Sequence, residues 1–125
     1  MKKSLLLIAL LSFKLLASEP MLKETPYVYV KSSIGKGKPY FLEIGSESCH
    51  SCQIMGKLLY KVKKQHPEYQ VYFINVKKER HVAQKLAIRM IPTQIIYDTV
   101  GKEVYRHIGP LGTDELLALF KRYKF

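Results

Sequence analysis

The sequence predicts an α/β domain in which a central mixed β-sheet is flanked by helices. Short β-prone apolar runs alternate with amphipathic helical segments, in the order strand, helix, strand, helix, strand, strand, helix. The chain has 125 residues, enough for one domain, and 47% of them are hydrophobic, enough for one packed core. Two cysteines and no visible repeat exclude disulfide-dense scaffolds, four-thiolate metal sites and solenoids.

The hydrophobic pattern also places the individual elements. Strands are predicted at residues 40–45, 69–76, 93–97 and 102–108, and helices at residues 50–65 and 79–88, with a last helix capped by Thr113. The inward-facing side chains are predicted to be Ile54, Leu58 and Val62 with Met55 and Leu59, then Val82, Ala83 and Leu86, and finally Leu116, Leu117 and Phe120. Because a helix joins the first two strands, they should be parallel, whereas the last two form a hairpin.

Residues 27–38 admit two interpretations. The run Tyr-Val-Tyr-Val from Tyr27 to Val30 is β-prone. Thr25 followed by Pro26, however, is typical of an N-cap with proline at the first helical position. We favour the helix, which the glycines of residues 35–39 would end.

The first 18 residues are predicted to be a signal peptide. Lys2 and Lys3 form a basic region, and Ser4–Phe13 is an apolar run of ten residues, within the roughly 7–15 residues of a signal core. Ala17 and Ser18 suit a cleavage site. The alternative is an uncleaved N-terminal anchor. We therefore expect a periplasmic protein with no stable membrane span after cleavage.

The net charge of +11 raises the question of a nucleic-acid partner. Without residues 1–18 and their three lysines, the remaining 107 residues carry a net charge of +8. The lysines are scattered along the chain, and export argues against nucleic acid, so a solvated basic face is expected instead. The predicted organisation is a signal peptide at 1–18, an N-terminal extension at 19–34 and one domain at 35–125.

The chemistry is carried by Cys49-His50-Ser51-Cys52 at the start of a predicted helix. Two cysteines at this spacing lie on one face of a helix, where they can close a small disulfide ring. The free N–H groups and partial positive charge of a helix N-terminus favour a thiolate at Cys49. Cys49 is therefore the expected nucleophile, and Cys52, one turn further on, is the expected resolving thiol.

The cysteine pair has two alternative roles, a structural disulfide and a metal site. A purely structural disulfide is disfavoured because a four-residue ring constrains the unfolded chain very little. A metal site needs further ligands, and the histidines, which we expect at the surface apart from His50, have no regular ligand spacing: His50, His66, His81 and His107. Gln53 stands where a c-type haem site requires histidine. No metal and no cofactor is therefore expected.

Residues 35–125 resemble the thioredoxin superfamily. The motifs that carry the resemblance are a Gly-Lys-Pro sequence at residues 37–39, the CxxC, and Ile91-Pro92-Thr93 before a hairpin. A CxxC alone is weak, but one followed forty residues later by Ile-Pro-Thr is specific. The resemblance implies a thioredoxin-like fold and thiol:disulfide oxidoreductase activity.

The resemblance also implies roles for single residues. Pro92 would be cis and lie against the CxxC, leaving the Ile91 backbone free to pair with an extended client; an ordinary trans proline at a strand start is the alternative. Glu43 would be the buried acid that exchanges protons with the resolving cysteine, unless its carboxylate lies in water at a strand edge. Ser48 stands where the family usually has tryptophan, so it joins Ile91 and Pro92 on the expected client surface.

His50 has two equally weighted readings. A protonated ring directly after the nucleophile would stabilise the thiolate and make the site more oxidising. Alternatively, His50 is a solvent-facing helix residue. His50-Ser51 replaces the family's usual Gly-Pro, so the redox poise cannot be copied from cytosolic thioredoxins.

The predicted function is an exported thiol:disulfide oxidoreductase with protein thiols and disulfides as clients. Exported oxidases of the superfamily carry an inserted helical domain and isomerases a dimerisation domain, so a small single domain favours a reductase. Such a protein needs a membrane electron-transfer partner, and apocytochrome c is one class of client with thiols to be kept reduced. The alternatives are a disulfide oxidant, a copper metallochaperone using Cys49, Cys52 and a histidine, and a binding module with incidental thiols.

Overall fold

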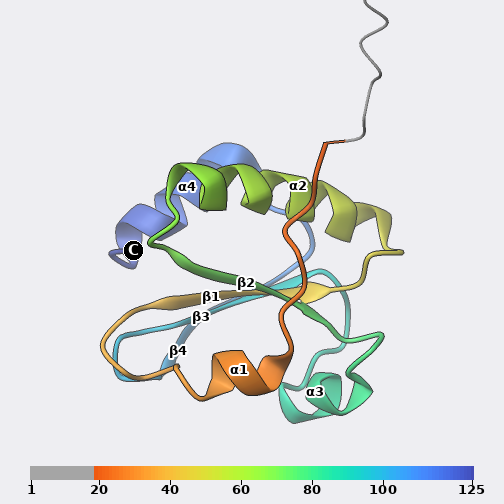
Figure 1. Ribbon diagram of the computed structural model, residues 1–125, viewed down its shortest axis with the longest axis horizontal. Helices are drawn as coiled ribbons and strands as arrows, with labels where there is room; N and C mark the ends of the chain where they lie inside the picture. The colour runs from red at the N-terminus through yellow and green to blue at the C-terminus, as the bar shows by residue number, and fades with distance from the viewer. Residues whose placement is uncertain (1–18) are drawn as a thin grey trace, which may run out of the picture.

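The computed structural model describes residues 19–125, so the predicted signal peptide lies outside the described residues. A four-stranded sheet lies between two layers of helices, with α2 and α4 on one face and α1 and α3 on the other (Figure 1). This is the predicted fold class. The elements are α1 (Tyr27–Lys31), β1 (Tyr40–Gly45), α2 (His50–Gln65), β2 (Gln70–Asn75), α3 (Arg80–Lys85), β3 (Thr93–Tyr97), β4 (Glu103–Ile108) and α4 (Thr113–Arg122).

The strands are ordered β2-β1-β3-β4 across the sheet. The pair β1–β2, joined by α2, is parallel, and β3–β4 is an antiparallel hairpin, as predicted. β3 also runs antiparallel to β1, with Ile44 opposite Thr93. The central strand β1 is therefore hydrogen-bonded on both sides, and all six of its residues are buried.

Successive side chains of β1 point to opposite faces of the sheet and pack into two apolar cores. Phe41 lies in the core beneath α2 and α4, against Phe120 with ring centroids 5.3 Å apart. Leu42 and Ile44 lie in the opposite core, with Val82 of α3. Such two-sided burial explains why β1 reads as a nearly continuous apolar run rather than as an alternating one.

Residues 19–26 run past the outer edge of the sheet from the α2 layer to the α1 layer (Figure 1). The Leu22 N–H donates to the Gly56 carbonyl at 2.9 Å, and the Thr25 N–H donates to the Phe73 carbonyl at 2.8 Å. Residues 27–31 then form the favoured helix, α1, which buries Tyr27 against the sheet. The segment therefore covers the edge of β2, which would otherwise expose unpaired backbone groups.

Two helix faces differ from the prediction. In α2 the buried side is formed by Cys52, Met55, Gly56, Leu59 and Val62, whereas Ile54 is 48% exposed. In α4 the buried residues are Leu116, Leu119 and Phe120, and Leu117 is 46% exposed. The helical period allowed either stripe, and contact with the sheet selects the one that carries Cys52.

The predicted N-caps were also wrong by one position. Pro26 and Gly112 occupy the N-cap positions of α1 and α4, and neither helix has a side-chain cap hydrogen bond. Thr113 is instead the first residue of α4. Within residues 19–125, the structure contains no helix of the length and apolar character needed to cross a membrane.

Adjacent leucines on α4 test the packing of this helix. Leu116 has an exposed fraction of 0% and Leu117 one of 46%. Leu116→Ala should lower the free energy of unfolding by about 2–5 kcal/mol because it leaves a cavity. Leu117→Ala should lower it by less than about 1 kcal/mol. Urea titrations of the two variants measure the difference, and equal losses would contradict this assignment of the buried face.

Candidate active site

The two cysteines lie at the first turn of α2, just beyond the carboxyl end of β1. Cys49 occupies the N-cap position with an extended backbone, and the Cys52 N–H donates to Cys49 Sγ at 3.4 Å. Both are free thiols; Cys49 is half-buried and Cys52 is buried. A helix N–H thus points at the more exposed of the two sulfurs, an arrangement that stabilises negative charge on it.

Cys52 packs tightly against the end of β1. A Cβ atom on Gly45 would lie 2.8 Å from Cys52 Sγ, so only glycine leaves room for this sulfur. Burial, followed by the hydrogen bond with Cys49, raises the pKa of the Cys52 thiol to about 12. Negative charge on Cys49 or Glu43 acts in the same direction. Cys52 therefore needs a nearby base to become a nucleophile near neutral pH.

Glu43 is a carboxyl group buried in the central strand, with an exposed fraction of 1%. Burial raises its pKa well above 4.5, a hydrogen bond from Gln94 partly opposes this, and charge on Cys49 raises it further. Glu43 and Gly45 are two residues apart on β1, so their side positions share the sheet face that Cys52 covers. The structure thus brings a desolvated acid to the cysteine pair, instead of leaving it in water at a strand edge.

No role was predicted for Gln94 from the sequence, and His107 was predicted to lie at the surface. Gln94 is fully buried, and its Nε2 lies 3.2 and 3.4 Å from the two carboxyl oxygens of Glu43. His107 is half-buried, with Nδ1 2.7 Å from Gln94 Oε1. Hairpin spacing alone does not reveal this pair: regular pairing from Tyr97 opposite Glu103 would set residue 94 opposite residue 106, and a register shift between Ile96 and Tyr97 sets it opposite His107.

The register of β3 against β1 places Pro92 at the end of the sheet where the cysteines lie. The Ile91–Pro92 peptide bond is cis. The next residue, Thr93, pairs with Ile44, so Pro92 lies at the end of β1 where Gly45 contacts Cys52. Within residues 19–125, no backbone–backbone hydrogen bond involves Ile91.

Ser48 and His50 flank Cys49 on the exposed side of the site. The Ser48 hydroxyl lies 3.2 Å from the Ser46 hydroxyl and accepts from Lys77 Nζ, also at 3.2 Å. His50 is the first residue of α2 and is exposed. Their roles in client binding and in thiolate stabilisation stay predictions. Among the described residues, no three His, Cys, Asp or Glu side chains are grouped so as to hold a metal ion.

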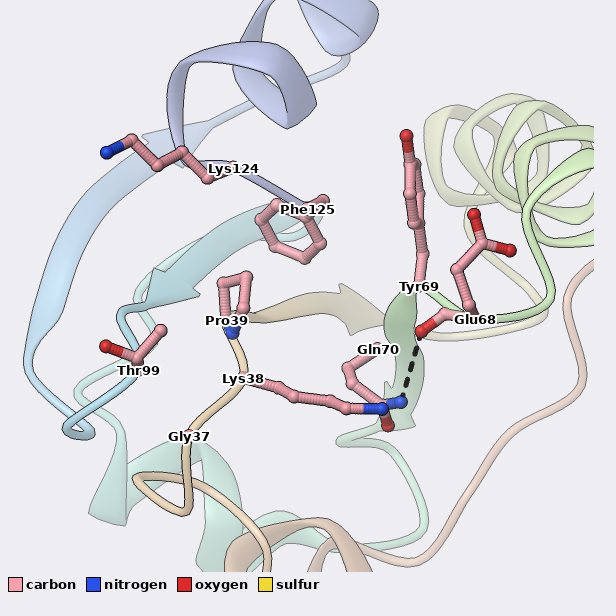
Figure 2. A pocket seen from close by; sticks show the side chains of 9 residues that line it. All are labelled: Gly37, Lys38, Pro39, Glu68, Tyr69, Gln70, Thr99, Lys124 and Phe125. Atoms are coloured by element: carbon pink, nitrogen blue, oxygen red, sulfur yellow. Dashed lines mark hydrogen bonds between the residues drawn. The ribbon is translucent and has the colours of Figure 1, made fainter.

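A hollow of about 300 Å³ lies at the opposite end of the domain. Its walls come from the turn before β1, the start of β2 and the C-terminal residues Lys124 and Phe125 (Figure 2). It opens beside Pro39, whereas the cysteines follow the other end of β1. Neither cysteine therefore lines this pocket.

The fold is shared with solved thioredoxin structures. Chloroplastic thioredoxin z is 16% identical, with a TM-score of 0.72 over 84% of this chain and 96% of that one. The thioredoxin of Malassezia sympodialis is 20% identical, with a TM-score of 0.68 over 85% and 95%. The thioredoxin of Fasciola hepatica is 21% identical, with a TM-score of 0.70 over 82% and 99%. No curated protein matches the sequence significantly.

The family follows from a sequence match that covers most of the chain. The profile of the thioredoxin-like domain matches residues 28–124, from within α1 to beyond the end of α4. This range contains both cysteines, the buried acid and the cis proline. A half-buried and a buried thiol at one helix start support a thiol:disulfide oxidoreductase. The chain belongs to the thioredoxin-like domain family.

Proposed function

We propose that the protein reduces disulfides of client proteins in the cell envelope, with Cys49 as nucleophile and Cys52 as resolving thiol. The observation that carries the proposal is the unequal burial of the two sulfurs. Cys49 is accessible and accepts a hydrogen bond from the first turn of α2, whereas Cys52 is buried against Gly45. One sulfur can meet a client, and the other can act only after a client is bound.

The first step is attack on the client. The Cys49 thiolate attacks one sulfur of the client disulfide, the S–S bond breaks, and the other client sulfur leaves as a thiolate. A mixed disulfide then joins Cys49 to the client. An extended client segment can pair with the free backbone of Ile91, and Pro92 and Ser48 line the same surface.

The second step releases the client. Glu43 takes the proton of the Cys52 thiol, and Cys52 Sγ attacks Cys49 Sγ, so that the second client sulfur leaves. The client gains two electrons and ends with two thiols, while Cys49 and Cys52 end as a disulfide. A carboxyl whose pKa burial raises well above 4.5 is a stronger base than an exposed one, which suits proton transfer from a thiol.

The reducing direction and the location rest on the sequence. The predicted signal peptide supports export. Between Cys52 and Pro92 the chain forms the rest of α2, then β2 and α3, which leaves no inserted helical domain. Continued reduction in an oxidising compartment requires two electrons per turnover, and a membrane electron-transfer partner would supply them.

The two cysteines should differ in what they trap. Cys49→Ser should abolish reduction of an insulin-type disulfide because it removes the attacking sulfur. Cys52→Ser should instead accumulate mixed disulfides at Cys49, visible on non-reducing gels, because the resolving sulfur is missing. The double variant is the control and should trap nothing. Equal trapping by the two single variants would contradict the division of roles.

Glu43→Gln should slow the resolving step by about a hundredfold near neutral pH, because an amide cannot accept the Cys52 proton. The rate of the first attack should stay unchanged. Rapid-quench kinetics with a disulfide substrate separate the two steps, and Glu47→Gln, an exposed carboxyl two residues before Cys49, serves as control. Equal slowing of both steps would contradict the base role.

The stability of the protein should depend on pH through Glu43. Folding raises its pKa above 4.5, so the folded state binds the proton more tightly than the unfolded state. The contribution of Glu43 to stability is therefore present at low pH and declines as the pH rises from about 4.5 through the folded-state pKa. Glu43→Gln should remove this decline in urea titrations across pH. An unchanged decline would show that Glu43 is not its source.

The thiols should be mostly reduced in intact cells. Acid quenching followed by an alkylating reagent traps Cys49 and Cys52 in the state they hold in the cell. A reductase recharged by an electron donor keeps the pair as dithiols. A mostly disulfide-bonded pair would overturn the reducing direction in favour of an oxidant.

A further inference from the structure

Three polar side chains form a row across the sheet on the face covered by α2 and α4. Glu43 on β1 lies opposite Gln94 on β3, and Gln94 lies opposite His107 on β4. Each pair is hydrogen-bonded, so the row runs without a break from the buried carboxyl to a half-buried ring on the outer strand. On the other side of Glu43 the row ends at Phe73 of β2, an apolar neighbour.

The available hydrogen-bond donors and acceptors limit which protonation states of Glu43 and His107 can occur together. A carboxylate on Glu43 can only accept, so it requires the Nε2 donor of Gln94, which lies 3.2 Å away. The amide is planar, so its Oε1 then faces His107 Nδ1 at 2.7 Å. That oxygen can only accept, so the ring must carry a proton on Nδ1. Gln94 thus couples the charge of Glu43 to the position of the proton on the His107 ring.

We propose that Gln94 and His107 are positioning residues for Glu43, and that an ionised Glu43 requires the Nδ1–H form of His107. By reciprocity, a His107 ring that offers an Nδ1 lone pair disfavours the carboxylate. The kinetic consequence of this coupling rests on the proposed function, in which Glu43 must be ionised to take the Cys52 proton.

The opposite state is also fully paired. A protonated Glu43 can donate its O–H to Gln94 Oε1 once the amide has turned over, and Gln94 Nε2 then donates to an unprotonated His107 Nδ1. Between the two states, Glu43 gains or loses one proton. A neutral His107 ring exchanges its proton between Nδ1 and Nε2 through water and keeps the same charge.

Other titratable groups also face this row. At the start of α2, charge on Cys49 raises the pKa of Glu43, and charge on Glu43 raises the pKa of Cys52. On the outer side, Tyr105 of β4 stacks on the His107 ring with centroids 6.4 Å apart. Burial raises the pKa of Tyr105, and charge on Glu115 and Tyr123 raises it further. The test variants, Gln94→Met and His107→Phe, therefore keep all of these titratable groups. Only the control variant changes one of them, Tyr105.

The first test is the titration of Glu43 in the reduced protein without a client, followed by the ¹³C signal of its carboxyl carbon. Gln94→Met should raise the midpoint, because the Gln94 hydrogen bond lowers the pKa of Glu43. His107→Phe should raise it too, because Gln94 Oε1 loses its donor and the amide is free to turn this oxygen toward Glu43, where only a protonated carboxyl can pair with it. About threefold fewer carboxyls should then be ionised below the midpoint. The double variant should match Gln94→Met alone, since His107 acts through Gln94.

The control is Tyr105→Phe, which keeps the stacked ring and should leave the midpoint unchanged. The second readout is the ¹⁵N signature of His107, which should move to the Nδ1–H form as Glu43 ionises and should not move in Glu43→Gln. An unshifted midpoint in His107→Phe, effects of the two variants that add, or a His107 signature that ignores Glu43 would each overturn the coupling.

The kinetic consequence separates this inference from the proposed function. Below the midpoint, His107→Phe should slow the resolving step about threefold and leave the first attack unchanged. A shifted midpoint with an unchanged resolving rate would overturn the positioning role of His107 in the reaction. A shifted midpoint in a protein that exchanges no disulfides would contradict the proposed function and leave the coupling intact.

Discussion

The burial of one carboxyl group, that of Glu43, is the constraint on which the site depends. The residue stands on a strand that is paired on both sides and covered on both faces, so water cannot solvate it. A buried polar group must find partners within the protein, and Gln94 supplies them from the neighbouring strand. The same burial raises the pKa of Glu43 and, one layer above, that of Cys52. A carboxylate formed at Glu43 is therefore a stronger base toward the neighbouring Cys52 thiol than an exposed carboxylate would be.

The sheet order explains how distant parts of the chain meet at this point. The strand β1 ends at Gly45, and the chain then turns into α2, so Cys49 and Cys52 lie over its carboxyl end. The antiparallel strand β3 begins at that same end, which brings Pro92 alongside. The hairpin to β4 adds His107 one strand further out. A protein client approaching Cys49 would therefore meet an open backbone segment at Ile91.

Most of the fold and the cysteine pair could be predicted because the sequence patterns that indicate them are local. The pattern of apolar residues located the four strands and the three helices after residue 40, and the spacing of Cys49 and Cys52 identified the cysteine pair. The short helix α1 was favoured over a strand because of Thr25 and Pro26. Which of two adjacent stripes of α2 faces the sheet depends on packing against β1, which the period alone does not specify. The pairing of Gln94 with His107 could not be predicted for a similar reason. A glutamine and a histidine thirteen residues apart gain meaning only from the register of a hairpin and from the acid beside it.

The central claim is that Cys49 and Cys52 form one reversible redox pair. Equilibrating the purified protein with mixtures of reduced and oxidised glutathione, followed by acid quenching and mass spectrometry, measures it directly. The account predicts a single two-electron transition between the dithiol and an intramolecular Cys49–Cys52 disulfide, with little glutathione attached, because Cys52 resolves the mixed disulfide. A stable glutathione adduct on Cys49, or a dithiol that no ratio oxidises within the molecule, would contradict the account.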